Sequence, residues 1–300
     1  MNIIDGKTVS RLSFERTTSA VQRLRDRDIS PCLAVVVVGD DPASHVYVNS
    51  KVRRSNALGI GSQKFAMPHE TTQQELLDRV RALCEDDAVD GILVQSPPPA
   101  HIDERAIIEA MDPAKDVDCF HPYNAGKLAI GDTDGLLPCT PAGVIELLAH
   151  YEIETSGKHA VVIGRSNLVG KPLAQLLARK HPQGNATVSL CHSRTPDLAA
   201  FTRSADIVIA AVGCPGMVTG DMIKPGAVLI DVGINKIDAP ETKKGYRLVG
   251  DIDEASVTEK AGWLTPVPGG VGPMTIAMLM RNTVVAACRR RGVAIEDICY

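Results

Sequence analysis

The chain has 300 residues, of which 44% are hydrophobic, and a formal net charge of −4 from 32 basic and 36 acidic residues. This length suggests two domains of ordinary size, with enough apolar residues to build a core in each. The negative charge argues against nucleic acid as the main partner, because phosphate binding requires clustered positive charge.

The cysteine pattern and the N-terminal segment favour an intracellular location. The eight cysteines form no C-x-x-C pair and no His/Cys cluster with zinc spacing, so we expect reduced thiols and no metal. The opening segment MNIIDGKTVS has no apolar signal core. No apolar run approaches the roughly 18 residues of a membrane span. We therefore expect a soluble cytoplasmic protein without a membrane partner.

The first half alternates short apolar runs with helical patterns. CLAVVVVG (32–39) and GILVQ (91–95) are predicted to be buried strands, with helices around 43–58 and 72–84. This order favours parallel pairing through right-handed crossovers. PCTPAGVIELLAH (138–150) is predicted to be a helix that bridges two domains.

The rhythm restarts at residue 159, with strands predicted at 159–164, 186–191, 206–213 and 227–234. Lys171-Pro172 opens the clearest helix, 171–180, because proline loses no hydrogen bond at the first helical position. PVPGGVGPMT (266–275) is predicted to be a loop before a last helix, about 274–290. The fold class is therefore α/β: two α/β domains with a cleft between them, the second a Rossmann-type parallel sheet.

VVIGRSNLVGKP (161–172) reads as strand, glycine loop and helix. Gly164 permits a tight turn, Gly170 permits close approach, and the helix N-terminus offers free N–H groups to phosphate. The spacing is not the standard G-x-G-x-x-G, so by itself it also fits a plain loop.

The next strand ends in CHSRT (191–195) and lacks the acid that would bind the ribose 2′-hydroxyl of NAD. Arg165, Ser193 and Arg194 would instead surround a 2′-phosphate, which favours NADP; the alternative for Arg194 is a solvated loop residue. GCPG (213–216) and DVGIN (231–235) follow two further strands and would face the nicotinamide, or serve only as turns.

Four polar residues of the first half stand near the ends of predicted elements. Tyr47 and Lys51 share one helix face, Gln95 ends a strand, and Asp118 lies in the loop DPAKDVDCFHP. Each has an ordinary alternative: a solvated lysine, a strand-end amide that meets water, or a turn aspartate.

Taken together, the motifs of this chain resemble the FolD family of bifunctional methylenetetrahydrofolate dehydrogenases/methenyltetrahydrofolate cyclohydrolases. The resemblance runs from about residue 5 to 285 and rests on SHVYVNSK, GILVQSPPP, KDVDCFHP, TPAGV, GKHAVVIGRSNLVGKP, CHSRT, KPGAVLIDVGIN and TPVPGGVGPMT.

The resemblance implies two reactions. NADP+ takes a hydride from 5,10-methylenetetrahydrofolate, and water then opens the methenyl cation to 10-formyltetrahydrofolate. Such one-carbon folate interconversion serves purine, methionine and histidine biosynthesis. Residues 1–138 with helix 274–300 would form the folate-binding catalytic domain and residues 139–273 the NADP-binding domain, in a homodimer.

The family's site residues carry over by position. Lys51 would be the catalytic lysine, Tyr47 would stack on the folate, Gln95 would tune Lys51, and Asp118 would bind the pterin. The remaining matches are expected on the NADP side (Gly164, Arg165, Ser166, Ser193, Ile234) and on the folate side (Pro268, Gly269, Gly270, Val271).

The chemistry agrees with these roles. The hydride step needs positioning rather than a base, whereas the attacking water must lose a proton, which a neutral amine can accept. Lysine suits this place better than arginine, which stays charged. The chain departs from the family's usual residues at Cys119, where glycine is usual, and at Ser96 and Pro98, where leucines are usual. For Cys119 we favour a small buried apolar role.

Three other interpretations remain open at this point. The changes at 96, 98 and 119 are compatible with a dehydrogenase whose cyclohydrolase is weakened. A catalytically silent dinucleotide-binding protein is disfavoured by the presence of Lys51 and the glycine loop. A dehydrogenase of amino or hydroxy acids would need a basic clamp for a small carboxylate, which the first half lacks.

Overall fold

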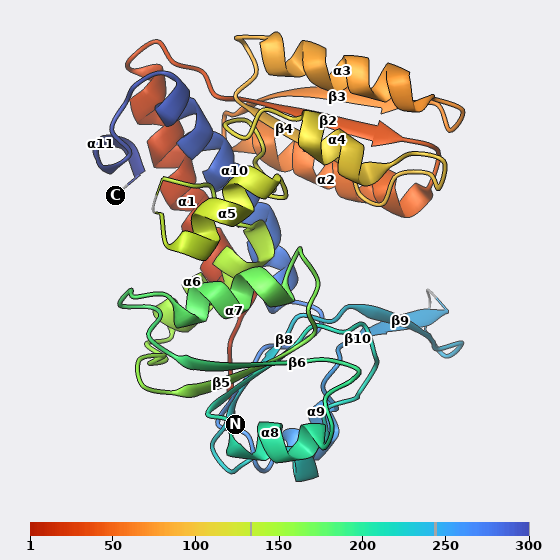
Figure 1. Ribbon diagram of the computed structural model, residues 1–300, viewed down its shortest axis with the longest axis vertical. Coiled ribbons are helices and arrows are strands. Elements are labelled where there is room, and N and C mark those ends of the chain that lie inside the picture. Colours follow the sequence, from red (N-terminus) through yellow and green to blue (C-terminus); the bar gives the residue numbers. More distant parts are fainter. Residues whose placement is uncertain (133, 243–244, 300) are drawn as a thin grey trace. The chain divides into compact units, whose positions relative to one another are not determined.

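The computed structural model describes residues 1–132, 134–242 and 245–299, and it divides into two compact units. The six-stranded unit contains residues 1–11 and 140–275, and the three-stranded unit contains residues 12–139 and 276–300. Two α/β domains, one with a Rossmann-type parallel sheet, are thus confirmed (Figure 1). The first eleven residues belong to the six-stranded unit.

The sheet of the six-stranded unit has the order β1-β11-β8-β7-β5-β6, and all its strand pairs are parallel. The four strands predicted in this half are present, although two of them end before the predicted residues 213 and 234. β1 and β11, at one edge of the sheet, were not predicted. Each is two residues long, which is too short for a hydrophobic pattern to reveal. The strands are β1 (Asn2–Ile3), β5 (His159–Ile163), β6 (Thr187–Cys191), β7 (Ile207–Ala210), β8 (Val228–Asp231) and β11 (Trp263–Leu264).

Helices cover both faces of this sheet. α7 (Gly170–Ala178) and α8 (Leu198–Ser204) lie on opposite sides of it (Figure 1). α7 buries Leu173, Leu176 and Leu177 completely, which explains its apolar period. The remaining elements are η1 (Gly220–Met222), α9 (Glu254–Val257) and the antiparallel hairpin of β9 (Asn235–Asp238) with β10 (Tyr246–Val249).

The strand order reverses at β5, which pairs with β6 on one side and with β7 on the other. Ligands of open parallel sheets bind beyond the carboxyl ends of the strands at such a reversal. Gly164 follows β5 at this place with φ of +114°, and a Cβ atom on it would lie 2.2 Å from the carbonyl oxygen of Ala211. Only glycine fits there.

The three-stranded unit is a parallel sheet of order β3-β2-β4. α3 and α4 pack on one face of it and α2 lies on the other (Figure 1). Residues Ala34 to Val37 of β2 are at most 1% exposed, as their continuous apolar run predicts. The elements are β2 (Cys32–Val38), α2 (Pro42–Ala57), β3 (Gly61–Met67), α3 (Gln73–Glu85), β4 (Gly91–Val94), α4 (Glu104–Ala110) and α5 (Pro122–Ile130).

Local capping sets the start of the helices in this unit. Asp41 accepts a hydrogen bond from Ser44 N at the start of α2, where Pro42 occupies the first turn. Thr72 and Glu75 form a complete capping box at the start of α3. These caps place α2 directly after β2, and therefore place its side chains at the carboxyl edge of the sheet.

Three helices have residues in both units: α1 (Gly6–Arg25), α6 (Cys139–His150) and α10 (Val271–Arg290), and α11 (Glu296–Cys299) ends the described chain. The predicted helix at 138–150 corresponds to α6. α10 begins at Val271, three residues before the predicted start, because Gly272-Pro273 occupies its first turn, where the missing N–H of proline has no helical partner anyway.

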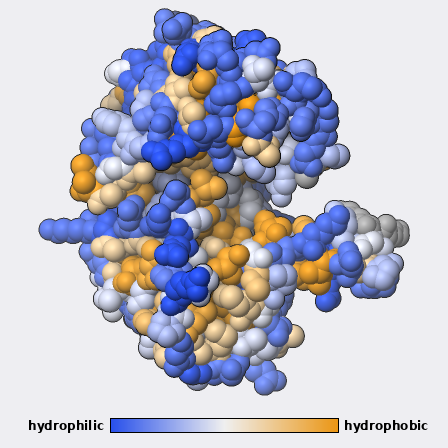
Figure 2. Space-filling model, turned by 45° about the vertical axis from the view of Figure 1, so that its right-hand side comes forward, coloured by the Kyte–Doolittle hydropathy of each residue, from blue (hydrophilic) through white to orange (hydrophobic). Residues whose placement is uncertain are grey.

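Among the described residues, α10 is the one helix long and apolar enough to span a membrane by composition, and 72% of its apolar window is buried within the protein. This is the behaviour of a core helix. On the face shown in Figure 2, hydrophilic residues cover much of the surface and hydrophobic residues form separate patches.

Candidate active site

The side chains of Lys51 and Gln95 meet at the carboxyl edge of the three-stranded sheet. Lys51 Nζ donates to Gln95 Oε1 over 3.1 Å, and Gln95 Nε2 donates to the carbonyl oxygen of Ser96 over 2.7 Å. The second bond fixes the amide orientation, because a flipped amide would place its NH2 group against the ammonium. Gln95 therefore presents a neutral acceptor to Lys51 and adds no charge.

Tyr47 lies one helical turn before Lys51 on α2 and is 52% exposed. Residues four apart on a helix lie on the same face. The next residue, Val48, is fully buried, so the helix turns its other side to the core. The phenol is therefore available to a planar ligand beside the Lys51 amine.

The loop after residue 115 carries Asp118. Burial raises the pKa of Asp118, and the nearby charge of Lys51 acts in the opposite direction. The loop itself is held by Asp116, whose carboxylate accepts hydrogen bonds from Cys119 N (3.0 Å) and His121 N (2.7 Å). Burial raises the pKa of Asp116 to about 6. Asp118 and Lys51 thus lie close enough to interact, as the sequence predicted for one site.

Cys119 is in the left-handed region with φ of +63°, a conformation that strongly favours glycine. Its side chain is 2% exposed and Sγ donates to the carbonyl oxygen of Leu136 over 2.9 Å. The predicted small buried role of this residue is therefore what the structure shows. The thiol and its carbonyl partner offset part of the backbone cost of a non-glycine residue at this turn.

Two further residues support the Asp118 loop, and sequence reasoning did not find either. Asn282 on α10 donates through Nδ2 to the carbonyl oxygens of Val117 and Leu137, both over 2.8 Å. Cys139 lies beside Asp118, and burial raises the pKa of its thiol. The sequence does carry one signal for Asn282: it is the single asparagine of the apolar helix α10. A buried amide needs hydrogen-bond partners, so its presence there indicates a polar contact inside the protein.

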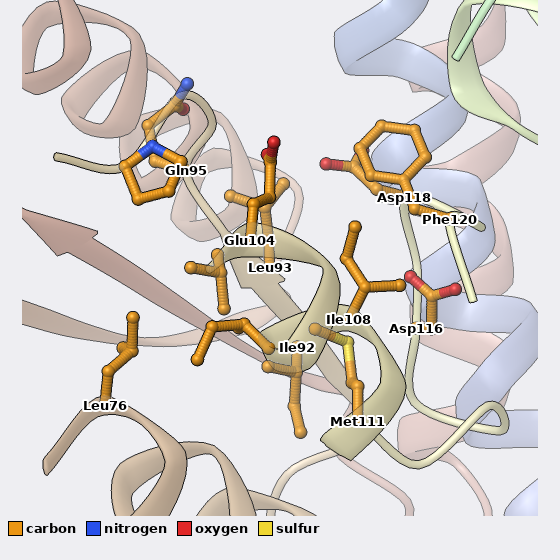
Figure 3. A pocket seen from close by; sticks show the side chains of 13 residues that line it. Leu76, Ile92, Leu93, Gln95, Glu104, Ile108, Met111, Asp116, Asp118 and Phe120 are labelled. Carbon is orange, nitrogen blue, oxygen red and sulfur yellow. The ribbon is translucent and has the colours of Figure 1, made fainter. Parts of the chain in front are cut away.

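An apolar pocket adjoins these residues within the three-stranded unit. In Figure 3, Gln95 and Asp118 lie toward one end of it and Leu76 and Met111 toward the other. Pro98, one of the two changes from the usual leucines, is among the lining residues. Ser96 contributes its carbonyl oxygen to Gln95, and its peptide bond to Pro97 is cis.

In the six-stranded unit, Gly164 and Gly170 approach each other at the start of α7. A Cβ atom on Gly170 would lie 2.0 Å from the carbonyl oxygen of Gly164. Ser166 Oγ accepts from Val169 N (3.1 Å) and Gly170 N (3.4 Å), so this side chain ties the loop to the start of α7. The two glycines therefore allow the backbone after β5 to pack directly against the start of α7, which a side chain at Gly170 would prevent.

The residues predicted around a 2′-phosphate lie at one edge of this sheet. Ile163 and Cys191 are paired in register, so Arg165 and Ser193 follow neighbouring strand ends. Arg165, Ser193 and Arg194 are exposed. Their basic and hydroxyl groups suit an anionic ligand at this edge.

Ile234 and the segment Pro268–Val271 belong to the same six-stranded unit. Ile234 is 48% exposed, and its Cδ1 atom lies 3.5 Å from the position that a Cβ atom on Gly272 would take. Gly269 has φ of +118°, and the bond between Val267 and Pro268 is cis. Within the described residues, no group of three His, Cys, Asp or Glu side chains could hold a metal ion.

Comparison with family models identifies both halves of the chain. Residues 4–118 match the catalytic domain of tetrahydrofolate dehydrogenase/cyclohydrolase, and residues 138–291 match its NAD(P)-binding domain. A curated relative, the bifunctional protein FolD of Chlorobium phaeobacteroides (strain BS1), is 53% identical over 291 residues, which cover 96% of this chain and 98% of the relative.

Solved structures agree. The bifunctional FolD enzyme of Campylobacter jejuni superposes with a TM-score of 0.91 at 47% identity, over 97% of this chain and 99% of that one. The FolD enzyme of Trypanosoma brucei, solved with NADP and an inhibitor, gives a TM-score of 0.89 at 39% identity, over 96% and 97% of the two chains.

Proposed function

The chain belongs to the tetrahydrofolate dehydrogenase/cyclohydrolase family, and we propose that Lys51, Gln95, Asp118 and Tyr47 carry its chemistry. The enzyme oxidises 5,10-methylenetetrahydrofolate to the methenyl compound with NADP+ and hydrolyses that compound to 10-formyltetrahydrofolate. The observation that carries the proposed roles is the hydrogen bond from Lys51 to Gln95, with Asp118 close enough for Lys51 to influence its pKa.

NADP fits the six-stranded unit, because the glycine loop and the exposed basic edge offer what its phosphates require. We assign Gly164 and Ser166 to the pyrophosphate side, Arg165 and Ser193 to the 2′-phosphate, and Ile234 to the nicotinamide side. The bound cofactor supplies the hydride acceptor. The protein's own contribution to that step is positioning, since the two nitrogen atoms flanking the donor carbon drive hydride departure.

The hydrolysis depends on residues of the three-stranded unit. Water that attacks the methenyl cation must lose a proton, and the Lys51 amine accepts it directly or through a second water. Gln95 holds that amine with a neutral oxygen. A carboxylate at this position would form an ion pair with protonated lysine and so favour its charged form. Asp118 accepts from the N–H groups of the pterin, and Tyr47 stacks on the folate.

The two units divide this work. We assign folate binding and catalysis to the domain expected at residues 1–138 with 274–300, and NADP binding to the domain expected at 139–273. Pro268, Gly269, Gly270 and Val271 would contact the folate. We also propose that the protein is a homodimer and that it works in the cytoplasm. The free thiols of the described cysteines fit a reducing compartment. Light scattering coupled to gel filtration tests the dimer.

The decisive experiment follows both reactions in one cuvette. Purified protein is mixed with 5,10-methylenetetrahydrofolate and either NADP+ or NAD+, and reduced cofactor and methenyltetrahydrofolate are recorded together. Reduced NADP without methenyl accumulation supports the bifunctional enzyme. Accumulation of methenyltetrahydrofolate indicates that Ser96, Pro98 or Cys119 has weakened the second step. Absence of reduction with both cofactors overturns the dehydrogenase and leaves a silent dinucleotide-binding protein.

A further inference from the structure

Two buried carboxylates that the proposed mechanism does not use lie beneath the turns after β7 and β8. Asp231 is 3% exposed and Asp251 is fully buried. Buried carboxylates are costly unless hydrogen bonds satisfy them, so their partners indicate what they hold in place.

Asp251 holds the turn after β7 through three consecutive backbone N–H groups. Its Oδ2 accepts from Val212 N (2.7 Å) and Gly213 N (3.0 Å), and its Oδ1 accepts from Cys214 N (2.8 Å). Residues 212–214 are themselves exposed. The carboxylate therefore fixes the backbone of a turn whose outer side is free to meet a ligand.

The same two carboxylates bracket Ile234 after β8. Asp231 Oδ1 accepts from Gly233 N over 3.0 Å, and Asp251 Oδ1 accepts from Asn235 Nδ2 over 2.9 Å. The exposed Ile234 side chain thus lies between one residue anchored to Asp231 and another anchored to Asp251.

The carboxylates are also tied to each other. Asp231 accepts from the backbone N–H groups of Asp251 (2.9 Å) and Ile252 (2.8 Å). Two glycines permit this packing: a Cβ atom on Gly233 would lie 2.3 Å from Asp251 Cγ, and one on Gly250 would lie 1.8 Å from Asp231 Oδ2. The sequence patterns DVG and GD at 231–233 and 250–251 are therefore two halves of one arrangement.

We propose that Asp231 and Asp251 are positioning residues for NADP+, which hold the turn at 212–214 and Ile234 as a fixed surface for the nicotinamide end of the cofactor. This inference rests on the proposed function. A dinucleotide binds beyond the carboxyl ends of the strands at the strand-order reversal, and β7 and β8 are the next two strands from that reversal. Both carboxylates are buried, and neither needs to touch the cofactor. Their role is to keep two turns in one conformation, which lowers the entropy that binding must remove.

The test uses Asp251→Asn in the full-length protein, with Asp253→Asn as the matched control. Asp253 precedes α9 and its side chain makes no capping hydrogen bond. An amide replaces one acceptor oxygen by a donor, so it cannot bind all three turn N–H groups. Calorimetry with NADP+ is expected to show a Kd at least tenfold above wild type for Asp251→Asn and within twofold for Asp253→Asn.

A second readout separates positioning from misfolding. A smaller folded fraction lowers the calorimetric stoichiometry but leaves Kd unchanged, whereas loss of positioning raises Kd at full stoichiometry. Cyclohydrolase activity on methenyltetrahydrofolate, measured without cofactor, is expected to stay within twofold of wild type.

Asn235→Ala provides a milder variant that removes a single hydrogen bond, with an expected rise in Kd of about threefold. If both Asp251→Asn and Asn235→Ala bind NADP+ like wild type, the positioning role is overturned. If wild-type protein itself neither binds NADP+ nor reduces it, the proposed function fails instead, so the two failures are distinguishable.

Discussion

The side-chain nitrogen of Lys51 donates to the amide oxygen of Gln95 over 3.1 Å, although the two residues are 44 positions apart. The bond joins the middle of α2 to the residue that follows β4. It explains why a lysine one turn after an exposed tyrosine is not simply a solvated side chain, and it leads to the first prediction.

Lys51→Met is expected to lower cyclohydrolase activity at least a hundredfold, because general base catalysis typically contributes a factor of about 10² to 10⁴. NADP+ affinity should not change, because the residues proposed to bind it belong to the other unit. Lys64→Met is the matched control, since the Lys64 ammonium donates to the exposed side chain of Asn49 over 2.9 Å and not to Gln95. Near wild-type hydrolysis by Lys51→Met would show that another group accepts the proton.

Arg165→Ala is expected to raise KM for NADP+ by about tenfold to a hundredfold, since a charge-assisted hydrogen bond is worth about 1.5–3 kcal/mol. KM for the folate substrate should stay within twofold. The best control is the cofactor itself: with NAD+, which lacks the 2′-phosphate, the variant and wild type should behave alike. An equal loss with NAD+ and NADP+ would rule out a 2′-phosphate contact.

Iodoacetamide at neutral pH is expected to label Cys214 first among the cysteines that the structure describes, because Cys214 is exposed. Cys119 and Cys139 are buried, and burial raises the pKa of both thiols, so the reactive thiolate is scarce there. Peptide mass spectrometry over a time course measures the order. In Cys214→Ser, early labelling should disappear; early labelling of Cys119 would contradict its buried position.

Asp116→Asn is expected to be more destabilising at pH 4 than at pH 7. The folded pKa of Asp116 is raised from 3.8 to about 6, so the folded state binds the extra proton between these values. This group therefore favours folding at low pH, and its contribution is lost as pH rises from about 4 to 6, by about 3 kcal/mol at 1.36 kcal/mol per pKa unit. Urea unfolding of both proteins across this range measures the difference. A pH-independent difference would show that the pKa of Asp116 is not raised.

Much of the architecture follows from the sequence because its signals are local. The run of valines in β2 requires burial on both faces, and the spacing of Leu173, Leu176 and Leu177 requires a helix with one apolar side. The edge strand β3, with the segment GSQKFAM, alternates exposed and half-buried residues, carries no such run and is not predicted from the sequence. β1 and β11 exist only because parallel neighbours pair with them.

The residues of the site also divide into those with a local sequence signal and those without one. Lys51 and Gln95 were expected from motifs, and the structure brings them together. Asn282 and Asp251 act through contacts with residues far away in sequence, so no local pattern distinguishes them from ordinary polar residues. Cys119 was noticed as a departure from glycine, but only its backbone angle of +63° explains why glycine is favoured there.

The interleaved units have a consequence for synthesis on the ribosome. The carbonyl oxygens of Val117 and Leu137 accept hydrogen bonds from Asn282, which is synthesised 145 residues after Leu137. These two hydrogen bonds cannot form before that residue has been added. All four residues proposed to carry the chemistry leave the ribosome long before that amide does. The three-stranded unit includes residues 276–300, so it completes its packing only near the end of translation. All the strands of the six-stranded sheet are synthesised before those residues.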